Sequence, residues 1–234
     1  MKLSLQQKLL LSLGVAAGIG ALAGAGTFAT FTAQTTNPDN AFQNGTLVLS
    51  NTVDTGTACL STGAGTNTDT NAFTSFDTAF GVTLAVPGDT DSADVTLIND
   101  GSVPASDLGV FSSGCTNANV STETYHGSGN PCNKIQITVQ QYSDPFSTAS
   151  TCLYGAATGN VCNFSDATKT LASFITDYPN SGDLLSLGTL AAKNGGTTDT
   201  AWVRVSLQLP SDADNTFQGR QATFALSWYM TQVP

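Results

Sequence analysis

Short segments of alternating apolar and polar residues, separated by Gly, Asn, Asp and Pro, constrain this 234-residue chain most. Across residues 134–142, isoleucine and valine alternate with glutamine and threonine. A period of two places the two sets on opposite sides of a strand, so this pattern predicts one buried face and one wet face. Residues 201–209 and 222–230 show the same alternation of apolar and polar residues. The predicted strands are 42–50, 80–86, 93–99, 108–112, 134–142, 201–209 and 222–230.

Turns and one helix interrupt the predicted strands. Residues 87–89, Pro-Gly-Asp, predict a turn because proline presets its first position and glycine relieves the next. Residues 99–101, Asn-Asp-Gly, predict a second turn, since Asp-Gly commonly connects hairpins. Apolar residues recur at helical spacing over 166–178, with Ser165 or Asp166 available as the N-cap. A weaker second helix is predicted over 183–187.

The number of strands favours one fold class. Seven or more strands with a short helical insertion predict an all-β fold, a single antiparallel jelly roll or β-sandwich spanning residues 30–234. Residues 59–71 and 116–131 are polar and rich in Gly, Ser, Thr and Asn, which predicts surface insertions.

Residues 1–29 are typical of an export signal. Lys2 and Lys8 flank a short basic region, residues 9–22 are apolar or small, and further small residues follow. Repeated glycines disfavour the alternative, a permanent transmembrane helix, because glycine is a poor helix former. Cleavage after Ala25 or after Ala29 fits, and both sites stay open. We therefore expect a secreted chain with no membrane attachment after cleavage.

Charge excludes several function classes. The chain has 7 basic and 17 acidic residues, a net charge of -10. Nucleic-acid binding needs clustered cations to neutralise phosphates, and attachment to an anionic membrane surface needs them too. A single histidine, His126, rules out a His-Glu-x-x-His zinc protease and lies in a polar insertion typical of a solvated loop. We therefore predict no catalytic residues.

Five cysteines predict disulfides in an exported chain. Their spacing contains no Cys-x-x-Cys pair, and one histidine cannot complete a zinc set. Many pairings are open, and we favour the two that close local loops, Cys115–Cys132 and Cys152–Cys162. Each would contribute roughly 2–4 kcal/mol. Cys59 would then be buried as a small apolar group or available for an intermolecular bond.

Acidic clusters are the remaining candidates for chemistry. Asp89, Asp91 and Asp94 lie close in sequence, as do Asp212 and Asp214. Such clusters are usually solvated, and their oxygens can also hold calcium, so both interpretations stay open for the first cluster. A glycosidase needs two carboxylates across a cleft, which spacing alone does not show. No other cofactor or metal is expected.

Several motifs, taken in order, resemble one protein family. They are Gly-Thr-Phe-Ala-Thr-Phe at 26–31, Phe-Gln-Asn-Gly-Thr-Leu-Val-Leu at 42–49, Val-Pro-Gly-Asp at 86–89, Ile-Asn-Asp-Gly-Ser at 98–102, Phe-Gln-Gly at 217–219 and Phe-Ala-Leu-Ser-Trp-Tyr-Met-Thr-Gln at 224–232. Together they resemble the TasA/camelysin family of exported, fibre-forming matrix proteins along the whole chain. The resemblance implies a jelly-roll subunit, released by a dedicated signal peptidase, that assembles with itself into biofilm-matrix or cell-surface fibres among other matrix components.

The resemblance also implies donor-strand exchange, in which the N-terminal segment of one subunit completes the sheet of the next. Residues 30–40 suit this role because they are extended and β-branched, and main-chain hydrogen bonds with alternating side chains support strand addition. The alternatives are a frayed terminus or an ordinary first strand. The predicted donor residues are Thr30, Phe31, Thr32, Ala33, Gln34 and Thr35.

Two rival functions stay open. Camelysin carries a metalloprotease label, which the shortage of histidine disfavours here. A surface adhesin or carbohydrate-binding sandwich would need exposed aromatic side chains on one sheet face, for which Trp202, Trp228 and Tyr229 are the candidates. In alternating strands such residues more often belong to the core.

Overall fold

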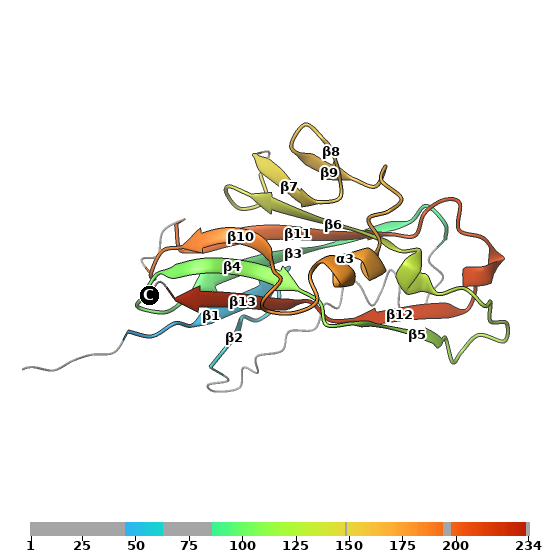
Figure 1. The fold of residues 1–234 in the computed structure, drawn as a ribbon, viewed down its shortest axis with the longest axis horizontal. Coiled ribbons are helices and arrows are strands. Elements are labelled where there is room, and N and C mark those ends of the chain that lie inside the picture. Colours follow the sequence, from blue (N-terminus) through green and yellow to red (C-terminus); the bar gives the residue numbers. More distant parts are fainter. Residues whose placement is uncertain (1–44, 63–85, 148, 194–197, 233–234) are drawn as a thin grey trace, which may run out of the picture. The chain divides into compact units, whose positions relative to one another are not determined.

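The computed structural model describes residues 45–62, 86–147, 149–193 and 198–232. Contacts divide the chain into Met1–Gln43 and Asn44–Pro234, and all of the described residues belong to the second unit. Figure 1 shows this unit as strands with one short α-helix. The elements are β1 (Leu49–Val53), β2 (Cys59–Leu60), β3 (Thr90–Asn99), β4 (Ala105–Phe111), β5 (Cys115–Asn119), η1 (Pro131–Asn133), β6 (Gln136–Tyr142), β7 (Ser150–Tyr154), β8 (Ala156–Thr158), β9 (Val161–Asn163), α3 (Leu171–Asp177), β10 (Leu185–Leu190), β11 (Thr200–Gln208), η2 (Asn215–Phe217), β12 (Arg220–Phe224) and β13 (Ser227–Gln232).

These strands form an all-β, antiparallel sandwich, as predicted. The larger sheet has the order β2-β1-β3-β11-β6-β7, and the smaller sheet has the order β10-β4-β13. The two remaining pairs are β12-β5 and β8-β9. In Figure 1 the β12-β5 pair continues the line of β13 and β4, so two chain segments form one long ribbon. The predicted signal peptide and the first residues of strand 42–50 lie outside the described residues.

The core lies between the two sheets and follows the predicted alternation. In β3, Ala93, Val95 and Leu97 are fully buried while the residues between them are half-buried. Valine, leucine and isoleucine side chains of β11 and β6 belong to the same core, and Leu108 and Val110 of β4 contribute to it from the smaller sheet. Burial at about 25 cal/mol per Å² of apolar surface is the main stabilisation of such a layer.

The wet face predicted for residues 134–142 is wrong. Gln136, Thr138 and Gln140 are 3%, 4% and 8% exposed, because the segment from β7 to β9 folds over this side of β6. Gln136 Nε2 donates to the carbonyl oxygens of Phe164 and Asp166 at 3.0 and 2.8 Å. The amides are therefore buried polar groups with partners, as burial requires.

The Asn-Asp-Gly turn is present but connects the two sheets instead of forming a hairpin. β3 pairs with β1 and β11, and β4 pairs with β10 and β13. The fully buried Asn99 holds this crossover, because its Nδ2 donates to the carbonyls of Val103 and Ala191 and its Oδ1 accepts from the Gly101 amide. A Cβ on Gly101 would lie 2.2 Å from the carbonyl oxygen of Thr46, so only glycine fits there.

The predicted helix begins later than expected. α3 starts at Leu171, because Thr170 and Ser173 form a reciprocal capping box instead of the predicted caps Ser165 and Asp166. The helix predicted over 183–187 is wrong, since Leu185–Leu190 forms β10 with alternating burial. Strands β5, β7, β8 and β9 were not predicted, because their short polar sequences lack a clear apolar period.

The strand predicted over 222–230 is divided into β12 and β13. Phe224 pairs with Cys115 and Ser227 pairs with Phe111, so three residues on one strand face two on the other. This mismatch is a bulge that bends the ribbon. Ser112, in the bulge, is buried and its amide donates to the Tyr178 carbonyl at 3.1 Å, which connects the bend to the end of α3.

Candidate functional site

β13 is one of the two edge strands of the smaller sheet. It pairs with β4 on one side, and no other described strand pairs with its second side. Met230 and Trp228 pack against the core, while Tyr229 is 40% exposed. An edge strand presents unpaired N–H and C=O groups to which another strand can add.

The sequence of β13 does nothing to block such addition. Its residues, Ser-Trp-Tyr-Met-Thr-Gln, include no charge and no proline, which are the usual devices that protect an edge. The opposite edge strand, β10, differs because its pairing with β4 shifts register around Gly188. Bulges twist an edge away from regular pairing. β13 stays in register with β4 from Ser227 to Thr231 and is therefore the better acceptor.

The predicted donor residues, from Thr30 to Thr35, lie outside the described residues, as does the whole of segment 30–40. The structure thus describes a candidate acceptor edge. Residue reasoning did not single out this edge, because nothing in an alternating sequence says which strand is last in its sheet. The absence of charge in residues 227–232 was the available signal.

Both favoured disulfides are present. Cys115 of β5 bonds to Cys132 of η1, with Cα atoms 6.1 Å apart. Cys152 of β7 bonds to Cys162 of β9, with Cα atoms 4.9 Å apart. Cys59 lies half-buried in β2 and belongs to neither bond. Disulfides persist in oxidising compartments, so this pairing fits an extracellular protein.

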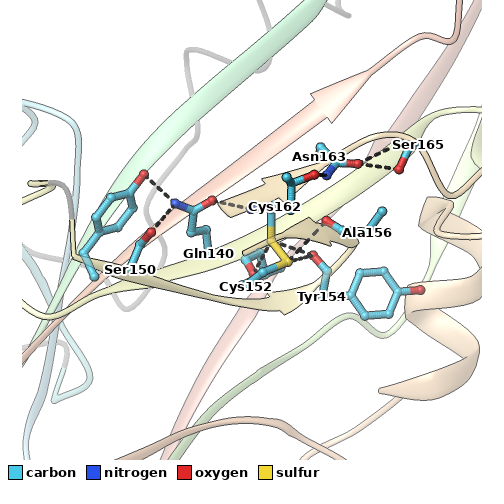
Figure 2. The surroundings of a disulfide bond; sticks show 11 residues. Gln140, Ser150, Cys152, Tyr154, Ala156, Cys162, Asn163 and Ser165 are labelled. Carbon is cyan, nitrogen blue, oxygen red and sulfur yellow. Dashed lines mark hydrogen bonds between the residues drawn. A yellow bond between two sulfur atoms is a disulfide. The ribbon is translucent and has the colours of Figure 1, made fainter. Parts of the chain in front are cut away.

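A polar network holds the second disulfide against β6 (Figure 2). Gln140 Nε2 donates to the hydroxyl oxygens of Tyr142 and Ser150 at 3.1 and 2.9 Å, and its Oε1 accepts from the Cys162 amide at 2.9 Å. One side chain thus connects β6, β7 and β9. The side-chain amide of Gln140, which was predicted to face water, therefore bonds to the β8-β9 hairpin that covers β6.

An aromatic cluster closes the space between this hairpin and α3. The Tyr154 ring lies edge-on to Phe174 at 5.1 Å and to Tyr178 at 5.9 Å. Its hydroxyl bonds to the hydroxyl of Ser173 at 2.9 Å. Burial raises the pKa of Tyr154 to about 12, because the phenolate would be desolvated. Lys169 covers the Tyr154 ring at 4.6 Å.

The three aspartates of the calcium hypothesis do not face one another. Asp89 Oδ2 accepts from the Val86 amide within the predicted turn, where Gly88 has φ +102. Asp91 and Asp94 point to opposite sides of β3 because they are three residues apart in a strand. Asp94 instead forms a bidentate pair with Arg204 at 2.6 and 2.7 Å.

Asp91 differs from its neighbours in having a buried carboxylate oxygen, Oδ2, with no hydrogen-bond partner among the described residues. Burial raises the pKa of Asp91. Among the described residues, no three His, Cys, Asp or Glu side chains come together as a metal site. The second acidic pair is also occupied, since Asp212 pairs with Lys134 at 2.8 Å and Asp214 caps η2.

The remaining sequence candidates lie apart from each other. His126 is half-buried in the loop after β5, with Nδ1 3.0 Å from the Gly219 carbonyl. Trp202 is buried beside Tyr142, and Trp228 is half-buried against the core. Of the three proposed glycan-binding aromatics, Tyr229 alone is exposed.

A cavity of about 460 Å³ lies at the end of the larger sheet, under the β12-β5 ribbon. Apolar residues of several elements line it, together with Arg220 and Ala222 of β12. Sequence reasoning missed this feature, because its walls come from loops and strand ends far apart in the chain. The apolar wall residues include Val86, Val120, Ile135, Leu209 and Phe217.

No helix in the described part of the chain has the length and apolar character needed to cross a bilayer. No protein-family model matches this chain, and no curated protein resembles it significantly.

Proposed function

We propose that this chain is an exported structural subunit that assembles with copies of itself, by donor-strand exchange, into extracellular matrix or cell-surface fibres. The observation that carries the proposal is the regular, uncharged edge of β13 in a smaller sheet of three strands. Residues 30–40 of one subunit would add to this edge in the next. Head-to-tail insertion does not close on itself, so it propagates a filament.

Two further features support an extracellular structural role. Both disulfides tie short loops to the sandwich, which suits a protein outside the reducing cytosol. The sequence of residues 1–29 has the basic region, apolar run and small residues of an export signal. The motifs that resemble the TasA/camelysin family favour the same assignment.

The donor half of the proposal is tested by deleting residues 30–40 from the chain that begins at Thr30. We expect the truncated chain to remain folded by circular dichroism and to form no fibres in negative-stain electron micrographs. A synthetic peptide of residues 30–40, added to the untruncated chain, should shorten its fibres by occupying the acceptor edge. Fibres of unchanged yield from the truncated chain contradict the proposal.

The acceptor half is tested by placing lysine on the edge. Tyr229→Lys puts a charge beside the exposed backbone of β13, and charged side chains oppose strand addition. Thr223→Lys is the matched control, because Thr223 is exposed on β12 in the same ribbon. We expect Tyr229→Lys to suppress fibres and Thr223→Lys to leave them. If both variants suppress fibres equally, the added charge, and not its position on β13, would explain the loss of fibres.

A further inference from the structure

The cavity under the β12-β5 ribbon has the size and lining of a small-molecule site, and the residues of the proposed acceptor edge do not line it. Its volume, about 460 Å³, falls within the roughly 300–1,000 Å³ of small-molecule sites. Its walls come from the turn before β3, the end of β11, the residues around η1 and the inner face of β12. Apolar walls with a few convergent polar atoms are the usual construction of such sites.

Two buried polar atoms in this region lack a hydrogen-bond partner among the described residues. Arg220 lines the cavity, and its Nε is buried with no hydrogen-bond partner among the described residues, while Nη1 donates to Asn119 Oδ1. Asn117, on the same face of the ribbon, has a buried Oδ1 that also lacks a described partner. Buried polar atoms normally have a hydrogen-bond partner, and these two lack one among the described residues.

The acids that line the cavity do not supply that partner. Asp214 is engaged with η2, since its Oδ1 accepts from the amide and hydroxyl of Thr216 at 2.9 and 2.5 Å. Glu123 lines the cavity without forming an ion pair with Arg220 among the described contacts. No described carboxylate therefore pairs with the Arg220 guanidinium, although this side chain lines the cavity.

We propose that this cavity binds an amphiphile, with an apolar chain against the walls and a carboxylate head that accepts a hydrogen bond from Arg220. A carboxylate suits the guanidinium, because charge-assisted hydrogen bonds are stronger than neutral ones. A cationic head would leave the Nε donor unpaired. The inference is independent of fibre formation, because Tyr229 of the acceptor edge does not line the cavity.

The test is calorimetric titration of the full chain with decanoate and, separately, with decyltrimethylammonium, both below their micelle concentrations. We expect saturable binding of decanoate and weaker binding of the cation, although a net charge of -10 favours the cation electrostatically. Arg220→Gln should weaken decanoate binding roughly tenfold. It should not weaken cation binding, because the substitution removes a positive charge from the cavity wall. Tyr229→Lys should leave decanoate binding intact while suppressing fibres.

A matched pair of variants tests the location. Ala222→Leu adds volume inside the cavity, and Thr223→Leu makes a comparable change at the next residue, which is exposed. We expect Ala222→Leu to abolish decanoate binding and Thr223→Leu to preserve it, with both variants folded by circular dichroism. No saturable binding, equal binding of the cation, or equal effects of the two leucine variants would each overturn the proposal.

Discussion

The two flanks of the sandwich differ in their outer strands, which are covered by a hairpin on one flank and present an open edge on the other. Beside β6 and β7 the chain folds back as the β8-β9 hairpin, a disulfide joins Cys152 to Cys162, and Gln140 hydrogen-bonds across three strands. On the other flank, no further described strand pairs with the outer side of β13, which carries no charge and stays in register with β4 over most of its length. One flank is thus held by a disulfide and a side-chain network, and the other presents the open strand edge to which we assign assembly.

The largest effect on the covered flank should follow loss of its disulfide. Replacing Cys152 and Cys162 by serine is expected to lower the free energy of unfolding by about 2–4 kcal/mol, because the unfolded chain regains the entropy of an open loop. Guanidinium unfolding of the monomer measures it. The double replacement of Cys115 and Cys132 serves as the control for general disulfide loss. An unchanged midpoint in the first variant would show that the hairpin is held by other contacts.

The next effect should come from Gln140. Gln140→Leu keeps the side-chain bulk but leaves the Cys162 amide without its acceptor, which costs about 1–3 kcal/mol. Hydrogen exchange at the Cys162 amide should accelerate along with the drop in urea midpoint. Gln208→Leu is the matched control, since Gln208 is only half-buried in β11 and bonds to the exposed Thr90. Equal losses in both variants would refute a special role for Gln140.

A smaller effect concerns alkaline pH. Burial raises the pKa of Tyr154 from its ordinary value of 10.0 to about 12, so the folded state holds this proton more tightly than the unfolded state. The resulting stabilisation is present below pH 10 and is lost as pH rises from 10 through about 12. Tyr154→Phe should therefore lose less stability over this range in urea titrations. The exposed Tyr125→Phe is the control and should follow the unmodified chain.

The smallest effect on the monomer should be that of Tyr229→Lys. Surface changes away from special features usually stay within about 0.5 kcal/mol, so this variant should unfold at nearly the same denaturant concentration while losing fibres. Thr138→Lys provides the contrast on the covered flank, because Thr138 is 4% exposed and lies against Gly155. We expect Thr138→Lys to be strongly destabilising. Similar thermal midpoints for the two lysine variants would remove the distinction between the flanks.

Alternation predicted the strands that form the core. Residues 93–99, 108–112, 134–142 and 201–209 each coincide with an observed strand to within a few residues, because their period of two places apolar groups on one side. The strands that were missed, β7 to β9, are short and polar. β7 pairs with β6, whereas β8 and β9 pair with each other, and none of the three has an apolar period that would predict a strand.

The sites were predictable to a different degree. The two disulfides could be proposed from loop length, because closing a short loop costs little chain entropy. The separation of Asp91 from Asp94 followed only when residues 90–94 proved to be strand, since a loop could have brought the carboxylates together. The cavity at Arg220 could not be predicted, because its walls converge from distant segments.

The sequence alone determined the all-β class, the acidic surface, the local disulfides and the inward-facing core residues. Each follows from residue type and short-range spacing, which act within one strand or loop. Tertiary structure alone decided that the polar side of β6 is buried, that Asn99 carries the chain between sheets and that β13 ends its sheet. Each of these features depends on which segments of the chain lie side by side, and the packing of the whole core sets that arrangement.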